Sequence, residues 1–339
     1  MSMSKYILKW AFAVALLSSL VMNNGFAKDD GCSITSPSPT INFGYQTSFT
    51  IVNKPLYTHV NDAGLTCKNP FLTLGYTQKM SITPVASSST TEAFLSQSGN
   101  NNLAERIPYL IYYEKSMSTP VVLGKKVTFE DKDFINILGS AGVNGVSTPV
   151  YVKIKPQNYN LPAGVYTDTI TLTWNWDICT GLGIGLICIG KDKGDGVSVI
   201  TVNLIVTEDC KISASDINFG SAPVTAAFSD VDGTINIICT KGTFYSAGLS
   251  KGDNFSGSRR MKSGSNFIDY EIYKGNQAHE VWGNQGSERR DSASADENPG
   301  AGWGGTKAQR FNYRAKILPN QPNKPAGTYI DHIMIDVEF

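Results

Sequence analysis

The chain has 339 residues, and its 29 lysine and arginine residues balance its 29 aspartate and glutamate residues, for a net charge of 0. Neither sign forms a long run, so the charge pattern gives no support for nucleic acid or an anionic membrane surface as a partner. A chain of this length is expected to hold two domains of ordinary size.

Residues 1–27 have the layout of a secretory signal peptide. Lysines precede an apolar run from Trp10 to Met22, and small residues follow as far as Ala27, after which we expect cleavage. The apolar run is too short for a convincing membrane-spanning helix, and no later segment approaches about 18 apolar residues. We therefore expect an exported, soluble protein whose mature chain begins near Lys28.

Strand signals dominate the mature chain. Short runs rich in valine, isoleucine, threonine and tyrosine, such as "TPVYVKIK" from Thr148 and "GTINIICT" from Gly233, are separated by clusters of turn-forming residues. The pattern predicts an all-β fold of the sandwich type.

The chain also repeats itself. A Cys-x-Ile motif, an Ile-Asn-Phe-Gly motif, a tyrosine-rich strand, a glycine cluster and a Pro-Ala-Gly turn occur twice in the same order. They begin at positions 32, 41, 109, 139 and 162, and again at 210, 217, 270, 300 and 325. This order predicts two copies of one domain, the first over residues 28–206 and the second over residues 207–339.

All six cysteines lie in the mature part. An even number in an exported chain indicates three disulfides, although fifteen connectivities are possible. The repeat favours Cys32–Cys67 and Cys210–Cys239, each pinning a first strand to a nearby one, which leaves Cys179 and Cys188 to pair across a hairpin. No Cys-x-x-Cys pair or histidine cluster accompanies them, so we expect neither a metal site nor a cofactor.

The first copy contains a strand that the second lacks. After its last shared strand it continues through residues 179–194 into Val197–Val206, which reads as a strand that completes the first sandwich from within the chain. The second copy ends without an equivalent, so we expect an exposed edge and an apolar groove that accept a strand from a partner. Little chain precedes Cys32 for donation to a neighbouring subunit, which favours a place at one end of a linear assembly. The residues expected to face inward from this internal donor strand are Ile200, Val202, Leu204 and Val206.

The second copy resembles a known family. "CKISASDINFG", "YEIYKG", "GAGWGG" and "PAGTYIDHIMIDVEF" are similar to the spore coat protein U domain found in archaic chaperone–usher pilus subunits of the Csu type. The resemblance implies two immunoglobulin-like pilin sandwiches, the second of which needs a donor strand. It implies as partners a periplasmic chaperone, an outer-membrane usher and an adjacent pilin subunit. It further implies export through the periplasm to the cell surface, a position at the pilus tip, and attachment to an abiotic or host surface with biofilm formation.

Two apolar loops of the first copy are candidates for the binding surface. In "CTGLGIGLICIGKDKG", residues 179–194, apolar residues alternate with glycines, which make a poor wall for a buried strand. We therefore expect an exposed tip pinned by a Cys179–Cys188 bond, a buried strand being the alternative, and we expect "KDKGDG" to be a solvated turn rather than a calcium loop. The glycine-rich loop of residues 136–147 is the second candidate. The expected surface-binding residues are Leu138, Ala141, Val143, Leu182, Ile184, Leu186 and Ile187.

Other functions have weaker support. No nucleophile elbow, zinc-protease motif or phosphate-binding glycine loop is present, so we do not expect an enzyme. A lectin-like tip, in which Trp174, Trp176 or nearby tyrosines bind a glycan, is one alternative. The two tryptophans alternate on the strand before the apolar loop, although aromatic residues of this kind usually pack in a core. A coat or structural subunit without an adhesive site is the remaining alternative.

Overall fold

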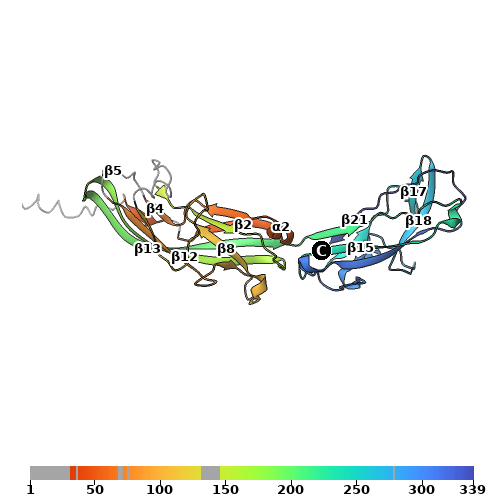
Figure 1. Cartoon of the computed structure of the whole chain (residues 1–339), viewed down its shortest axis with the longest axis horizontal. Coiled ribbons are helices and arrows are strands. Elements are labelled where there is room, and N and C mark those ends of the chain that lie inside the picture. Colours follow the sequence, from red (N-terminus) through yellow and green to blue (C-terminus); the bar gives the residue numbers. More distant parts are fainter. Residues whose placement is uncertain (1–30, 36, 68–71, 75–76, 131–145, 278) are drawn as a thin grey trace, which may run out of the picture.

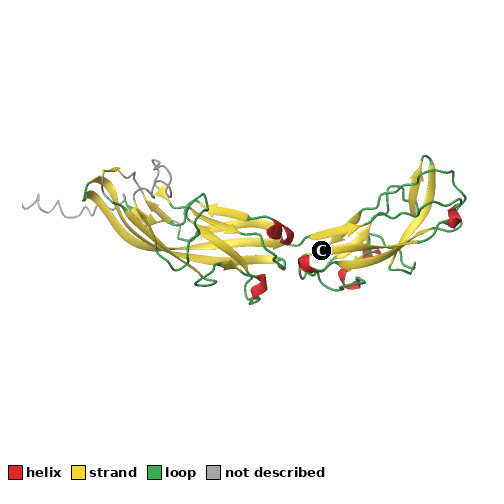
Figure 2. Ribbon diagram, in the orientation of Figure 1, coloured by secondary structure: helices red, strands yellow, loops and turns green. Residues whose placement is uncertain are grey.

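The computed structural model describes residues 31–35, 37–67, 72–74, 77–130, 146–277 and 279–339. Within these ranges the chain is almost entirely β, and its two domains lie end to end along the long axis (Figures 1 and 2). This confirms the predicted fold class of two tandem pilin-type sandwiches. The expected signal peptide, residues 1–27, lies outside the described residues.

No helix in the described part of the chain combines the length and the apolar character that crossing a membrane requires.

The first domain is built from three sheets, with strand orders β2-β13-β12-β6-β9, β3-β11-β8-β7 and β1-β4-β10. A short helix, α2, and one 3₁₀ turn lie at the end that faces the second domain. The strands are β1 (Cys32–Ile34), β2 (Thr40–Thr47), β3 (Leu56–Val60), β4 (Leu65–Cys67), β5 (Leu72–Leu74), β6 (Lys79–Ala86), β7 (Phe94–Leu95), β8 (Ile107–Tyr112), β9 (Val127–Glu130), β10 (Val146–Ser147), β11 (Val150–Ile154), β12 (Gly164–Ile184) and β13 (Ile187–Thr207); α2 spans Ser48–Asn53 and the 3₁₀ turn Leu103–Glu105.

A long hairpin forms the axis of the first domain. Its strands β12 and β13 have 21 residues each, which corresponds to a length of about 70 Å. The second half of β13 is the strand expected at Val197–Val206, and it runs antiparallel to β12 and parallel to β2. The four side chains expected to point inward, Ile200, Val202, Leu204 and Val206, are at most 1% exposed. Every second residue from Ile200 to Val206 is apolar and buried, and this period of two puts one face of β13 into the core.

The second domain has its own hydrophobic core, separate from that of the first. Its two sheets have the orders β14-β15-β20-β18-β17 and β19-β16-β21. The strands are β14 (Cys210–Ala214), β15 (Val231–Cys239), β16 (Ser246–Leu249), β17 (Arg259–Ser263), β18 (Asn266–Lys274), β19 (Arg290–Asp291), β20 (Gln309–Ile317) and β21 (Ile335–Glu338), and short 3₁₀ turns cover Thr225–Ala227, Gly286–Glu288, Ser292–Ser294 and Gly304–Thr306.

The three expected disulfides are present. Cys32–Cys67 joins β1 to β4, and Cys210–Cys239 joins β14 to β15 at the matching place in the second domain. The third bond, Cys179–Cys188, crosses the hairpin of β12 and β13. Each domain therefore has its first strand fixed covalently to a neighbouring strand.

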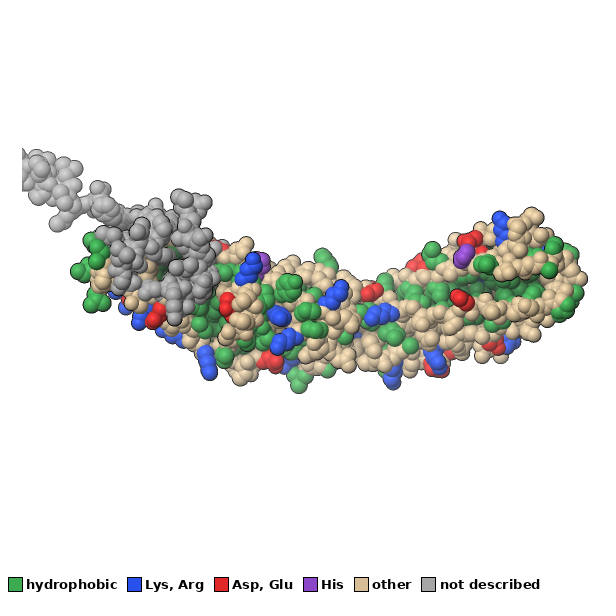
Figure 3. All heavy atoms as spheres, turned by 45° about the horizontal axis from the view of Figure 1, so that its top comes forward, with side chains coloured by type: hydrophobic (Ala, Val, Ile, Leu, Met, Phe, Trp, Pro, Cys, Tyr) green, Lys and Arg blue, Asp and Glu red, His purple; other side chains and the backbone are tan. Residues whose placement is uncertain are grey.

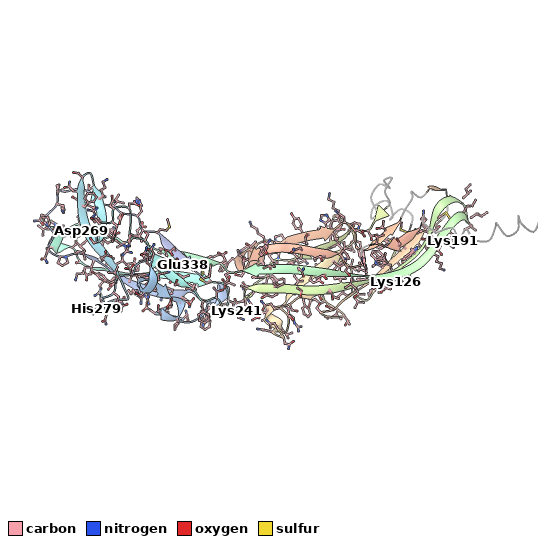
Figure 4. The ribbon with its side chains drawn as sticks, turned by 180° about the vertical axis from the view of Figure 1, so that it is seen from behind. Lys126, Lys191, Lys241, Asp269, His279 and Glu338 are labelled. Atoms are coloured by element: carbon pink, nitrogen blue, oxygen red, sulfur yellow. A yellow bond between two sulfur atoms is a disulfide. The ribbon has the colours of Figure 1, made fainter. Side chains whose placement is uncertain are left out.

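The joint between the domains is short and polar. Only residues 208 and 209 separate β13 from β14. Lys241 of the second domain lies at the joint (Figure 4), and its Nζ is 2.6 Å from Oε1 of Glu105 in the first domain. The hydroxyls of Ser48 and Thr240 are also hydrogen-bonded across the joint, at 3.0 Å. These contacts fix the direction in which one domain continues the other.

Candidate functional sites

The far end of the β12–β13 hairpin is apolar and exposed. Ile184 and Ile187 face each other across a two-residue turn, and Gly185 at its first position has φ +61°, as a type II′ hairpin turn requires. Leu186, the second turn residue, is 97% exposed, while Ile184 and Ile187 are 60% and 71% exposed. The end of the β12–β13 hairpin, which carries these three predicted residues, lies at the end of the molecule opposite the second domain (Figure 1).

Ile189 belongs to the same exposed tip, although the sequence reading did not include it. It lies two residues after Ile187 on the same face of β13 and is 69% exposed. The spacing of Ile187 and Ile189 could have predicted that both are exposed, because residues two apart on a strand lie on the same face. We call Ile184, Leu186, Ile187 and Ile189 the apolar tip.

The structure describes no side chain for four of the predicted surface-binding residues. Leu138, Ala141 and Val143 lie outside the described residues. The backbone of Leu182 belongs to β12, next to β5, but its side chain is not described.

The "KDKGDG" segment is strand rather than turn, so the prediction of a solvated turn is wrong. It forms part of β13, where Lys191 and Lys193 approach the carboxylate of Asp177 on β12 at 3.1 and 4.0 Å. Asp192 points inward and accepts hydrogen bonds from the backbone N–H of Cys32 at 2.7 Å and from the indole of Trp176 at 3.2 Å. These partners satisfy a buried carboxylate that would otherwise be costly, and they allow the hairpin to extend.

The tryptophans before the apolar tip are buried. Trp174 is fully buried and donates to the hydroxyl of Ser198 at 2.9 Å, and Trp176 is only 8% exposed. Neither indole face is available to a sugar ring. A lectin-like site built on these two tryptophans is therefore wrong.

The second domain contains an open groove. It has a volume of about 570 Å³, and Figure 3 shows hydrophobic side chains along its floor. One side is the chain that continues from β14, and the other is the chain that leads into β21, with no strand between them in the described residues. The apolar lining includes Ile217, Phe219, Leu249, Met261, Ile333 and Ile335.

The first domain has the same site with a strand in it. In both domains the tyrosine after the Pro-Ala-Gly turn donates to the carbonyl oxygen of that proline at 2.9 Å, Tyr166 in the first and Tyr329 in the second. In the first domain β13 lies between this segment and the Ile-Asn-Phe-Gly segment, pairing with both. The groove of the second domain is therefore the place that β13 fills in the first.

A hydrogen-bonded tyrosine–aspartate pair occurs in both domains, with its aspartate two residues after the tyrosine of the Pro-Ala-Gly turn. Tyr109 donates to Asp168 at 2.7 Å, and Tyr270 donates to Asp331 at 2.8 Å. Burial, together with the neighbouring carboxylate, raises the pKa of each tyrosine well above its ordinary value. Both phenols therefore remain protonated hydrogen-bond donors, which indicates a structural role for the two aspartates.

No group of three or more histidine, cysteine, aspartate or glutamate residues that could hold a metal ion occurs in the described ranges.

The spore coat protein U domain model matches residues 20–173 and 197–336. The second match covers most of the second copy of the repeat and begins with the stretch of β13 that fills the first domain. The chain belongs to the spore coat protein U domain family. The gap between the matches falls on the end of the β12–β13 hairpin, so this member of the family carries its apolar tip on a segment outside the shared pattern.

A solved structure with a TM-score above 0.5 supports the same fold for this spore coat protein U domain protein. The chain is similar to the chaperone–tip adhesion subunit pre-assembly complex of archaic chaperone–usher Csu pili from Acinetobacter baumannii, with a TM-score of 0.63 and 22% identity, covering 91% of this chain and 100% of that one. It is more distantly similar to the CupB6 tip adhesin of Pseudomonas aeruginosa, with a TM-score of 0.30 and 12% identity, covering 84% and 86% of the two chains. No curated protein matches the sequence.

Proposed function

We propose that this protein is the tip subunit of a chaperone–usher pilus and that it mediates attachment to surfaces and biofilm formation. The observation that carries the proposal is the contrast between the domains: β13 fills the first from within, while the matching place in the second is an open groove. A subunit with one complete and one incomplete domain suits the end of a fibre. The role is one of binding rather than catalysis, at the cell surface after export through the periplasm.

The partner of the groove would be a strand from the adjacent pilin subunit. If this strand follows β13, it runs antiparallel to the segment Tyr329–Ile335 and parallel to the segment that includes Ile217. Apolar side chains at alternate positions would enter the groove, and backbone hydrogen bonds would supply affinity on both sides. Before assembly, a periplasmic chaperone would cover the groove and deliver the subunit to an outer-membrane usher, because an apolar edge of this kind invites aggregation.

The partner of the apolar tip would be a hydrophobic surface, abiotic or on a host. Full burial of Ile184, Leu186, Ile187 and Ile189 corresponds to about 6–12 kcal/mol on transfer scales. Immobilisation reduces the net gain considerably, and the action of many pili together restores it as avidity. Leu138, Ala141, Val143 and Leu182 remain part of this proposal on the basis of the sequence.

Replacement of the tip side chains tests this proposal. Leu186→Ser combined with Ile187→Ser and Ile189→Ser is expected to abolish attachment of piliated cells to polystyrene while leaving the amount of surface pili unchanged, as measured by immunoblotting of sheared pili. The matched control is Val165→Ser, because Val165 is also exposed, at 55%, but lies at the opposite end of β12. Equal attachment by the triple variant and the control would refute the apolar tip as the binding surface.

A further inference from the structure

One face of the first domain carries four side chains that neither the tip nor the groove uses. Tyr57 and His59 lie on β3, and Tyr151 and Lys153 lie on the neighbouring strand β11. The register places Tyr151 opposite His59 and Lys153 opposite Tyr57, so the four side chains form a two-by-two block in which aromatic and basic groups alternate. We call them the flank block.

The flank block lies on the outer side of its sheet, where Tyr57 and His59 are exposed and Tyr151 and Lys153 are half-buried. The residues between its members on β11, such as Val152, are fully buried, which directs Tyr151 and Lys153 to the outer side of the sheet. Tyr57 is 68% exposed. The rings of His59 and Tyr151 are stacked at 5.1 Å between centroids, with an interplanar angle of 23°. The block is therefore a flat, pre-formed surface rather than a pocket.

The second domain provides an internal comparison for this face. Its strand β20 corresponds to β11, since both end at an isoleucine opposite the buried tyrosine of the tyrosine–aspartate pair. The residue three positions before that isoleucine is Tyr151 in the first domain and Arg314 in the second. On the neighbouring strand, Tyr151 faces His59, whereas Arg314 faces Asp232. Arg314 donates two hydrogen bonds to Asp232, at 2.7 and 2.8 Å. On this face of the second domain, the charge of the arginine is therefore neutralised by the aspartate opposite it.

The first domain lacks this neutralisation. The aspartate position is occupied by His59, and within the described part of the chain neither His59 nor Lys153 forms an ion pair. The same place in the fold thus carries a paired acid and base in one domain, and unpaired basic groups beside exposed rings in the other. An uncompensated basic group favours an anionic partner, and an exposed aromatic ring favours a partner with a flat apolar face.

We propose that the flank block binds an acidic polysaccharide, with a sugar ring stacked on Tyr57 and a carboxylate held by Lys153 and His59. The Cα atoms of the block span about 5 Å between strands and about 7 Å along them, an area suited to one or two sugar rings. Nucleic acid is disfavoured because its binding depends on several lysine and arginine contacts to phosphates, whereas the block contains one lysine. This site is separate from the apolar tip, and binding of a polysaccharide to it does not require the tip to contact a surface.

Binding of the full-length mature protein to immobilised alginate tests the proposal, with dextran as the neutral polysaccharide and single-stranded DNA as the competing polyanion. Lys153→Glu and Tyr57→Ser are each expected to weaken alginate binding about tenfold, which corresponds to about 1.4 kcal/mol. The matched controls are Lys126→Glu (Lys126 is labelled in Figure 4), which makes the same change in charge, and Tyr45→Ser, which removes a tyrosine that is 73% exposed. Both control positions belong to the other sheet or its approach, and these variants are expected to bind like the unmodified protein.

Weakening by the two block variants alone, with little binding to dextran, supports the site. Equal weakening by a control variant would overturn it, because the effect would then come from overall charge or surface area. An absence of alginate binding by the unmodified protein, or tighter binding to DNA than to alginate, would overturn it as well. The triple tip variant is expected to keep its alginate binding, so failure of the tip hypothesis and failure of this one are distinguishable.

Discussion

A copy of the strand that fills the first domain, appended after Phe339, is expected to close the groove of the second. If the register of the first domain is carried over, the copy of Ile200 faces Ile333, and a turn of about five to seven residues connects Phe339 to the appended strand. The four apolar side chains that β13 buries correspond to about 6–12 kcal/mol of transfer free energy. The conformational entropy lost by the added backbone opposes this gain, while new backbone hydrogen bonds to the segments on either side of the groove add to it.

A net stabilisation of about 2–3 kcal/mol would raise the Tm of the second domain by about 10 °C. Differential scanning calorimetry of the full chain measures this shift, and the transition of the first domain serves as an internal reference. The matched control is an appended strand with aspartate in place of the residues copied from Val202 and Leu204, which keeps the linker and the length. An unchanged Tm, or an equal shift with the control strand, would refute the assignment of the groove as the place of a missing strand.

Two further predictions concern the joint and the tip. Burial opposes the charge of Glu105, but hydrogen bonds from Lys241 and two asparagines outweigh it and lower its pKa below the ordinary 4.5. The contact therefore contributes fully above pH 4.5 and is lost as the pH falls below that value, so small-angle scattering should show a broader range of domain orientations in acid. Lys241→Met should show that range at neutral pH too, and identical profiles would contradict this account. Removal of the Cys179–Cys188 bond by serine substitution is expected to speed amide hydrogen exchange at Leu186 and its neighbours, since so short a ring contributes about 2–3 kcal/mol. Unchanged exchange at the tip would show that the strands alone hold it.

The features that repeat within the chain were the ones that the sequence predicted well. The two copies place their cysteines, Ile-Asn-Phe-Gly motifs and Pro-Ala-Gly turns in the same order, and this order is sufficient to derive the disulfides at Cys32 and Cys210. The apolar residues at every second position from Ile200 to Val206 predicted a half-buried strand, because a period of two is the geometric signature of a sheet with one covered face.

The structure of the hairpin beyond this repeat was not predictable in the same way. Gly194 and the charged residues around it are typical of a turn, yet they form part of β13, because the inward-pointing Asp192 finds two hydrogen-bond donors that lie far from it in the sequence or on the opposite strand. A side chain at Gly194 would meet the ring of Trp176, so glycine is needed there for close packing rather than for a turn. Composition cannot distinguish these two uses of glycine, since only the position of the neighbouring indole decides between them.

The connection between the apolar tip and the second domain also suits a subunit that is pulled at its tip, as the proposed function requires. The hairpin runs along the long axis of the first domain (Figure 1), so a pull on Leu186 acts along β12 and β13 rather than across them. β13 then continues through residues 208 and 209 into β14, where the Cys210–Cys239 disulfide transmits the force to β15. To extract β13, a pull along the strands must break its hydrogen bonds to β12 and β2 together rather than one after another. The proposed contact with a surface has no such ladder, so the geometry favours detachment at the apolar tip before unfolding of the domain that carries it.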